Sequence, residues 1–114
     1  MIISQSGVSV DDPRHYENIE RQLASENPSW LSINQYNNMQ NADAYYKTLG
    51  PEIWEQTNGK VTHIVAAGST GGTVSGTARY LKEKNPQIKV ICPDPYNSIF
   101  YDFWKSGHVV EPSS

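Results

Sequence analysis

The sequence contains a single cysteine, Cys92, among its 114 residues. One cysteine cannot form a disulfide within the chain, and sparse cysteine is typical of a reducing, cytoplasmic setting. No run of apolar residues approaches the roughly 18 that a membrane-spanning helix requires. The apolar start, Met1 to Ile3, is too short for the core of a secretory signal peptide. The sequence therefore predicts a cytoplasmic location and no membrane partner.

Positive charge is scarce as well. The chain has 9 lysine and arginine residues against 12 aspartate and glutamate residues, which gives a formal net charge of -3. Because no basic patch stands out, nucleic acid is not expected as a partner. His15, His63 and His108 have no metal-ligand spacing with one another or with Cys92, so no metal site is expected.

The remaining composition is that of an ordinary globular protein. Hydrophobic residues make up 37% of the chain and charged residues 18%, which excludes the composition of a disordered segment. A chain of this length forms at most one small domain or part of a larger one.

A helix is predicted over residues 11–24. Either Asp11 or Asp12 is expected to cap it, because a carboxylate there accepts from the free backbone amides, and Pro13 suits the first helical position. The Asn-Pro pair at 27–28 is expected to end it.

The next stretch gives weaker signals. The apolar residues 30–33, and those around Ile2, predict short strands. Residues 34–41 form a polar loop. Residues 42–57 are predicted to be mainly helical, with a break or bend at Gly50–Pro51.

The strongest pattern is a strand over 61–67, a glycine-rich turn over 68–73, a helix over 74–84 and a second strand over 88–92. Strand, tight turn, helix and strand make a βαβ unit, which builds a parallel sheet. The fold class is therefore α/β, a parallel sheet with flanking helices. Two good strands are few for such a sheet, so we expect the chain to be an incomplete portion of something longer.

The glycine-rich turn is a candidate phosphate site. A turn from a strand into a helix directs several backbone amides at one point, and the positive end of the helix dipole lies there. Glycine allows close approach of a phosphate, and Thr70 and Thr73 offer hydroxyl donors.

The spacing of the residues in this turn decides which known phosphate-binding motifs it can match. The nucleotide-binding P-loop requires a glycine five residues after Gly68, followed by lysine, and that position is Thr73, so a P-loop is not expected. The G-x-G-x-x-G start of a dinucleotide site is absent too. However, Asp94 lies where a ribose-binding acid would sit, so a dinucleotide-binding domain stays open as an alternative.

Four segments carry a specific pattern. Residues 34–38 read Asn-Gln-Tyr-Asn-Asn, and residues 44–57 contain Leu-Gly-Pro-Glu-Ile-Trp. Residues 59–76 contain Ser-Thr-Gly-Gly-Thr, and residues 79–86 read Arg-Tyr-Leu-Lys-Glu-Lys-Asn-Pro. Together they resemble the cysteine synthase and cystathionine β-synthase family, the fold-type II enzymes that depend on pyridoxal 5′-phosphate (PLP).

Weaker matches at residues 11–16 and 94–100 look closer to the cystathionine β-synthase branch. The resemblance implies a two-domain enzyme with PLP between its domains, and a homodimer when complete. Residues 1–34 would be the end of the smaller domain and 35–114 the first part of the larger, cofactor-phosphate-binding domain. The implied reaction is β-replacement on serine or an activated serine, with sulfide or homocysteine as the sulfur partner.

The resemblance also implies site residues. Gln35 stands at the glutamine that contacts the substrate carboxylate in the family. The family's glycine loop, typically Gly-Thr-Gly-Gly-Thr, holds the cofactor phosphate. Its positions fall on Ser69, Thr70, Gly71, Gly72 and Thr73. Ser69 replaces a glycine, which costs backbone freedom if that position requires a positive φ, so weaker or altered cofactor binding is expected.

The family's Schiff-base lysine is missing. None of the lysines here lies in the short segment that carries it in the family, and the neighbouring asparagine is missing too. We therefore expect a fragment with no catalytic residue of its own, inactive alone. A non-catalytic module that binds a phosphate ligand or a partner is the alternative.

The last third of the chain carries an aromatic cluster. In a complete protein these residues are expected in a core or between domains. If they are exposed, they would form a hydrophobic patch that promotes association. Together with unpaired sheet edges, they predict low stability or self-association for the isolated chain. The members are Tyr96, Phe100, Tyr101, Phe103 and Trp104.

Overall fold

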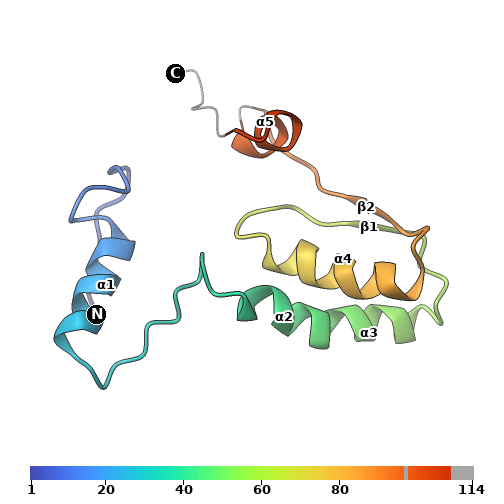
Figure 1. The fold of residues 1–114 in the computed structure, drawn as a ribbon, viewed down its shortest axis with the longest axis horizontal. Helices are drawn as coiled ribbons and strands as arrows, with labels where there is room; N and C mark the ends of the chain where they lie inside the picture. The colour runs from blue at the N-terminus through green and yellow to red at the C-terminus, as the bar shows by residue number, and fades with distance from the viewer. Residues whose placement is uncertain (97, 109–114) are drawn as a thin grey trace. The chain divides into compact units, whose positions relative to one another are not determined.

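The computed structural model describes residues 1–96 and 98–108. The chain forms two compact units, Met1–Asn34 and Gln35–Ser114 (Figure 1). The sequence predicts a division at the same place, between residues 1–34 and 35–114, as two parts of different domains. The assignment of the units to a smaller and a larger domain stays a prediction.

The first unit contains one helix, α1 (Tyr16–Glu26). The prediction of a helix from residue 11 was wrong at its start, because the N-cap is His15, whose Nδ1 accepts from the Glu17 amide. The Asp12 carboxylate is used in the preceding turn, where it accepts from the Arg14 backbone amide at 2.8 Å. The helix ends at the predicted place, with Asn27 as its C-cap.

The two weak strands are not formed. Residues around Ile2 and residues 30–33 have no strand structure. A strand requires a neighbour to satisfy its backbone groups, and the only strand pairing among the described residues lies in the second unit. The prediction of strands from local composition was therefore wrong at both places.

The second unit opens with two short helices, α2 (Gln40–Lys47) and α3 (Leu49–Gln56). They replace the single bent helix predicted over 42–57, and the break falls at Thr48. Pro51 has no amide hydrogen and its ring clashes with the carbonyl four residues earlier. The chain therefore interrupts the helix at Thr48, and Pro51 takes a place in the first turn of α3, where proline is tolerated.

The predicted βαβ unit is present. Strand β1 (His63–Val65), helix α4 (Gly72–Lys84) and strand β2 (Lys89–Ile91) follow one another, and the strands pair in parallel with Ile64 opposite Val90. Both strands are shorter than predicted, whereas α4 starts two residues earlier. The last two residues of the glycine loop thus form the first turn of the helix.

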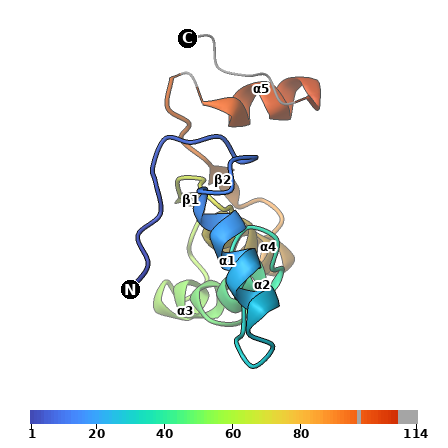
Figure 2. The ribbon, with the colours of Figure 1, turned by 90° about the vertical axis from the view of Figure 1, so that its left-hand side faces the viewer.

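Helix α4 is the centre of this unit. It packs on α2 and α3 and lies between them and the strand pair (Figures 1 and 2). Among the described residues, the buried hydrophobic side chains are Leu81 of α4, with no exposed surface, and Ile88 before β2. Close packing is possible because Gly76 and Gly50 lie at the contacts: a Cβ on Gly76 would be 2.0 Å from the Ala42 carbonyl oxygen, and one on Gly50 would be 2.6 Å from Tyr80 Cβ.

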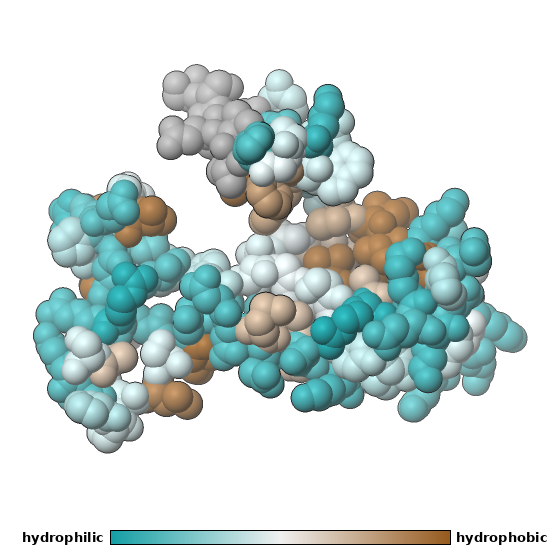
Figure 3. All heavy atoms as spheres, viewed as in Figure 1, coloured by the Kyte–Doolittle hydropathy of each residue, from teal (hydrophilic) through white to brown (hydrophobic). Residues whose placement is uncertain are grey.

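A further helix, α5 (Ile99–Ser106), was not predicted. Its N-cap is Ser98, whose hydroxyl oxygen accepts from the Phe100 amide. The aromatic cluster is largely on this helix and is exposed, with Trp104 at 79%. Apolar side chains also gather over the strand pair (Figure 3), where Val65 is 65% exposed. The exposed hydrophobic surface expected from the sequence is therefore present.

No helix within residues 1–96 and 98–108 is long and apolar enough to cross a membrane. The same part of the chain holds no cluster of three or more His, Cys, Asp or Glu side chains that could bind a metal ion.

Candidate functional site

The glycine loop joins β1 to α4 and turns at Gly71. This residue has a φ of +83°, in the left-handed region that only glycine enters at little cost, and it is the N-cap of α4. Ser69 is not among the residues with a positive φ. The backbone strain considered for serine at this position therefore does not arise.

The start of α4 is suited to an anion. Gly71 provides no side-chain cap, and the first turn carries no acidic residue. The first amides of a helix have no partner within the helix, and the helix dipole adds a partial positive charge there. A Cβ built on Gly71 would have nothing within 4 Å, so the loop faces open space and these residues fit a phosphate group.

A polar segment from the start of the second unit lies against this loop. The Asn41 Nδ2, in the first turn of α2, donates to the Thr70 Oγ1 at 2.9 Å. A pocket of about 140 Å³ lies at this contact, and both Gln35 and Thr70 line it. The structure therefore brings the predicted substrate-contacting residue and the predicted phosphate loop to one place.

The five loop residues differ in exposure. Gly72 is buried, Thr70 and Gly71 are half-buried, and Ser69 and Thr73 are exposed, as is Gln35. Ser75, one turn along α4, donates its hydroxyl to the Gly71 carbonyl at 2.6 Å. This bond fixes the turn and leaves the loop amides available.

A larger hollow of about 510 Å³ adjoins the other side of the loop. It is lined by the glycine loop, by residues of and after β2, and by aromatic residues of α5. Asp94 also lines it, but its carboxylate accepts from the Tyr101 amide at 3.0 Å and so serves the start of α5. That structural role accounts for an acid at this position without a ribose.

No lysine lines either pocket beside the loop. Lys82 of α4 donates its Nζ to the Pro86 and Ile88 carbonyl oxygens and so holds the turn into β2. Among the described residues the arrangement can bind and orient an anionic ligand, but it presents no amine for a Schiff base.

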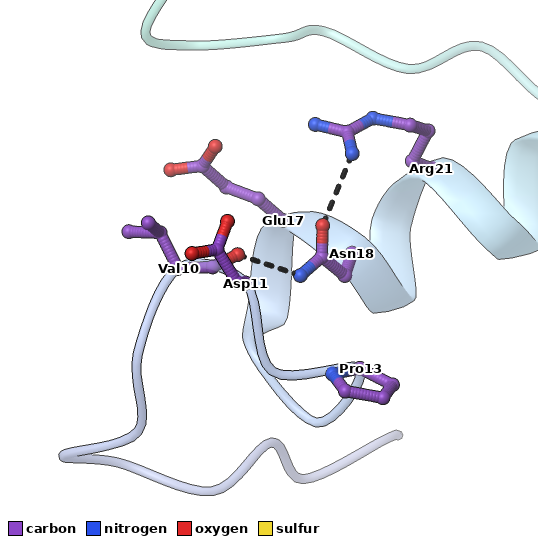
Figure 4. A pocket seen from close by; sticks show the side chains of 6 residues that line it. All are labelled: Val10, Asp11, Pro13, Glu17, Asn18 and Arg21. Carbon is purple, nitrogen blue, oxygen red and sulfur yellow. Dashed lines mark hydrogen bonds between the residues drawn. The ribbon is translucent and has the colours of Figure 1, made fainter.

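A third pocket, of about 540 Å³, lies in the first unit beside α1 (Figure 4). Two of its polar side chains are used within the unit: Asn18 donates to the Val10 carbonyl at 2.8 Å and accepts from Arg21 at 3.0 Å. Nearby, hydrogen bonds from Arg14 lower the pKa of Asp12 to about 2. None of the predicted site residues lies in this pocket.

Sequence reasoning missed Asn41. It lies in a stretch rich in asparagine and glutamine, so its residue type does not distinguish it from its neighbours. The only available signal was its place between the Asn-Gln-Tyr-Asn-Asn segment and the following helix, both of which belong to the family resemblance.

Comparison with known proteins supports the resemblance. A family model described as "Pyridoxal-phosphate dependent enzyme" matches residues 4–114. Cysteine synthase 1 of Neurospora crassa is 39% identical over 101 residues, which cover 88% of this chain and 27% of the relative. The O-acetylserine dependent cystathionine beta-synthase of Bacillus subtilis is 45% identical over 90 residues, or 79% of this chain and 29% of the relative.

A solved structure gives the same result. The crystal structure of the O-acetylserine dependent cystathionine beta-synthase from Helicobacter pylori matches with a TM-score of 0.69 and 38% identity. It covers 82% of this chain, which in turn covers 28% of that structure. The chain spans between 20 and 29% of the length of the curated relatives it matches.

These matches confirm the resemblance and the partial α/β fold. Relatives with both cysteine synthase and cystathionine beta-synthase names are among them. The chain belongs to the family of pyridoxal-phosphate dependent enzymes, within its cysteine synthase and cystathionine β-synthase group.

Proposed function

We propose that this chain supplies the cofactor-phosphate site of a PLP-dependent enzyme of sulfur amino-acid metabolism. Residues Ser69 to Thr73 hold the phosphate at the start of α4, and Gln35 contacts the carboxylate of the amino-acid substrate. The observation that carries the proposal is the Asn41–Thr70 hydrogen bond, because it joins the Gln35 segment to the phosphate loop. The electropositive start of α4 supports the same assignment.

The reaction of the parent enzyme is β-replacement on serine or an O-activated serine, with sulfide or homocysteine as the acceptor. The names of the relatives support this class of reaction, and the Bacillus subtilis and Helicobacter pylori relatives are described as O-acetylserine dependent. Bound PLP supplies an electron-withdrawing ring that stabilises negative charge at the substrate α-carbon.

The residues of this chain bind the cofactor and orient the substrate. The lysine amine that forms the Schiff base is not among them. The loop amides and the Thr70 hydroxyl donate hydrogen bonds to the phosphate, while Gln35 orients the substrate. No lysine of the sequence stands in the family's Schiff-base segment, so the chain alone is inactive. We further propose that the complete enzyme is a cytoplasmic homodimer and that residues 1–34 form the end of its smaller domain.

The test is ligand binding by the purified 114-residue chain. PLP should bind more tightly than pyridoxal, which lacks the phosphate, and inorganic phosphate should compete with PLP. Borohydride treatment of the complex should leave no single lysine uniquely modified in a mass spectrum. Equal affinity for PLP and pyridoxal would contradict the proposal, as would turnover of serine with homocysteine by this chain.

The absence of lysine from both pockets also favours a second candidate, a non-catalytic module that binds a phosphate ligand. The same titration separates the two. The cofactor-phosphate site of a PLP enzyme prefers PLP to other phosphates. A non-catalytic module that binds any phosphate ligand binds PLP, a sugar phosphate and inorganic phosphate with similar affinity. Binding of NAD with no binding of PLP would instead favour the dinucleotide alternative.

A further inference from the structure

The Thr70 side chain is held by one specific partner. Its Oγ1 accepts a hydrogen bond of 2.9 Å from the Asn41 amide nitrogen, and both side chains are half-buried. The two residues come from different elements, Thr70 from the glycine loop and Asn41 from the first turn of α2. Their positions are therefore fixed relative to each other by the packing of α2 on α4.

The direction of this bond has a consequence for the hydroxyl proton. A threonine hydroxyl has one hydrogen to donate and two lone pairs that accept. Because the lone pair facing Asn41 is occupied by the amide hydrogen, the Thr70 hydrogen must point to another acceptor. Among the hydrogen bonds of residues 1–96 and 98–108, none has Thr70 Oγ1 as its donor.

The Asn41 amide also lies against Gly72. A Cβ added to Gly72 would lie 2.0 Å from the Asn41 Oδ1 and 2.8 Å from its Nδ2. The amide group therefore lies directly against the loop backbone, in space that any other residue at position 72 would occupy. Its carbonyl oxygen faces Gly72 and its nitrogen faces Thr70.

We propose that Asn41 is a positioning residue that presents the Thr70 hydroxyl as a hydrogen-bond donor to the cofactor phosphate. The inference rests on the proposed function and deepens it, because it assigns a role to a residue outside the predicted loop. Asn41 acts through Thr70 by fixing the direction in which the hydroxyl proton points. Replacing the asparagine amide by a group that accepts reverses that direction.

The test uses the full 114-residue chain with three single variants, one double variant and one control. Asn41→Asp keeps the shape but cannot donate, so it turns the Thr70 hydroxyl away from the phosphate. Asn41→Leu removes the polar contact at similar volume, and Thr70→Val removes the hydroxyl. Gln40→Glu is the matched control, because it makes the same charge change on the neighbouring exposed residue of α2. Far-UV circular dichroism establishes that each variant is folded.

The first readout is the ratio of the dissociation constants for pyridoxal and PLP, which isolates the phosphate. Asn41→Leu and Thr70→Val should each lower this ratio by about three- to tenfold, the usual range for one hydrogen bond, and Asn41→Asp by about tenfold or more. The double variant Asn41→Leu with Thr70→Val should lose no more than Thr70→Val alone. Gln40→Glu should change the ratio by less than about twofold.

The second readout is the pKa of the bound PLP phosphate, followed by phosphorus-31 NMR. A donated hydrogen bond favours the dianion and lowers this pKa, so Asn41→Leu should raise it toward the value in solution. A purely structural role of Asn41 would not move it in the same way as Thr70→Val. If Asn41→Leu does not fold, the comparison of Asn41→Asp with Gln40→Glu decides.

The outcomes separate the two proposals. A wild-type chain that does not prefer PLP to pyridoxal overturns the proposed function and this inference with it. A wild-type chain that prefers PLP, but keeps that preference unchanged in Asn41→Leu and Asn41→Asp, overturns this inference alone. A loss in Asn41→Leu that persists at full size in the Thr70→Val background also overturns it, because Asn41 would then act independently of Thr70.

Discussion

The guanidinium carbon of Arg79, on α4, lies 4.1 Å from the centre of the Tyr46 ring, on α2. The same guanidinium donates to the Asp43 carboxylate at 2.8 Å. The Tyr46 hydroxyl reaches back to α4, where it donates to Glu83 at 2.6 Å. This cluster joins, at the surface, the two helices that position Asn41 and the glycine loop.

Removing Arg79 should weaken that attachment. Arg79→Ala loses a cation–π contact and a half-exposed ion pair, so the free energy of unfolding should fall by about 1 kcal/mol. Urea denaturation followed by circular dichroism measures this change. Lys60→Ala, at an exposed lysine outside the helices, is the control and should alter stability by less than about 0.5 kcal/mol. Equal effects of the two substitutions would contradict the prediction.

Gly76→Ala should be strongly destabilising. Alanine in place of glycine inside a helix ordinarily stabilises by about 1 kcal/mol. Here the new Cβ would lie 2.0 Å from the Ala42 carbonyl oxygen, so α2 and α4 must separate. We expect a loss above about 2 kcal/mol, as for overpacked cores. Thermal melts measure it, with Thr73→Ala on the exposed first turn of α4 as control. A stabilised Gly76→Ala chain would refute the close helix contact.

Stability should decline in alkaline solution because of Tyr46. Its hydrogen bond to Glu83 raises the pKa of Tyr46 above its usual value of 10. The contribution is therefore fully present below pH 10. Above it, the unfolded chain releases the tyrosine proton while the folded chain retains it, so stability is lost as the pH rises through the folded pKa.

Tyr46→Phe should remove this dependence on pH while keeping the ring beneath Arg79. Unfolding free energies from urea titrations between pH 8 and pH 11 measure it, since about 10 is the ordinary tyrosine pKa. Tyr96→Phe, at a fully exposed tyrosine, is the control and should follow the wild type. The prediction fails if Tyr46→Phe and the wild type lose stability in parallel.

Gly72→Ala should impair ligand binding more than folding. The added Cβ collides with the end of the Asn41 side chain rather than with backbone. That side chain can rotate away, but it then no longer reaches Thr70. We expect about a three- to tenfold loss of the preference for PLP over pyridoxal, the range for one hydrogen bond, with a small change in melting temperature. Fluorescence titration and a thermal melt measure both quantities. A large loss of stability without loss of preference would contradict it.

The βαβ unit could be predicted because its signals are local. A β-rich apolar run, a glycine turn and an amphipathic segment lie in sequence over 61–92. The boundaries moved by one or two residues, because hydrogen-bond partners decide where a strand ends. Gly72 and Thr73, expected in the turn, entered α4 since nothing in their backbone opposes helix.

The strands near Ile2 and at 30–33 could not be judged locally. A strand exists through its neighbour, and no described segment pairs with either. The role of Asn41 could not be predicted for the same reason, since its hydrogen bond with Thr70 joins positions 29 apart. Its residue type is shared with several amides nearby, and only the packing of α2 on α4 singles it out. The sequence shows that serine replaces glycine at position 69. It does not show that Ser69 avoids a positive φ.

The proposed phosphate site is built from one continuous stretch of the sequence. Its pocket takes all its lining from residues 35 to 75, and its defining hydrogen bond closes a loop of 29 positions. The entropy cost of closing a loop grows only slowly with its length, so closing this one costs little more than closing a shorter loop. Residues 35–75 are synthesised one after another, so the Asn41–Thr70 contact needs no partner from a more distant part of the sequence.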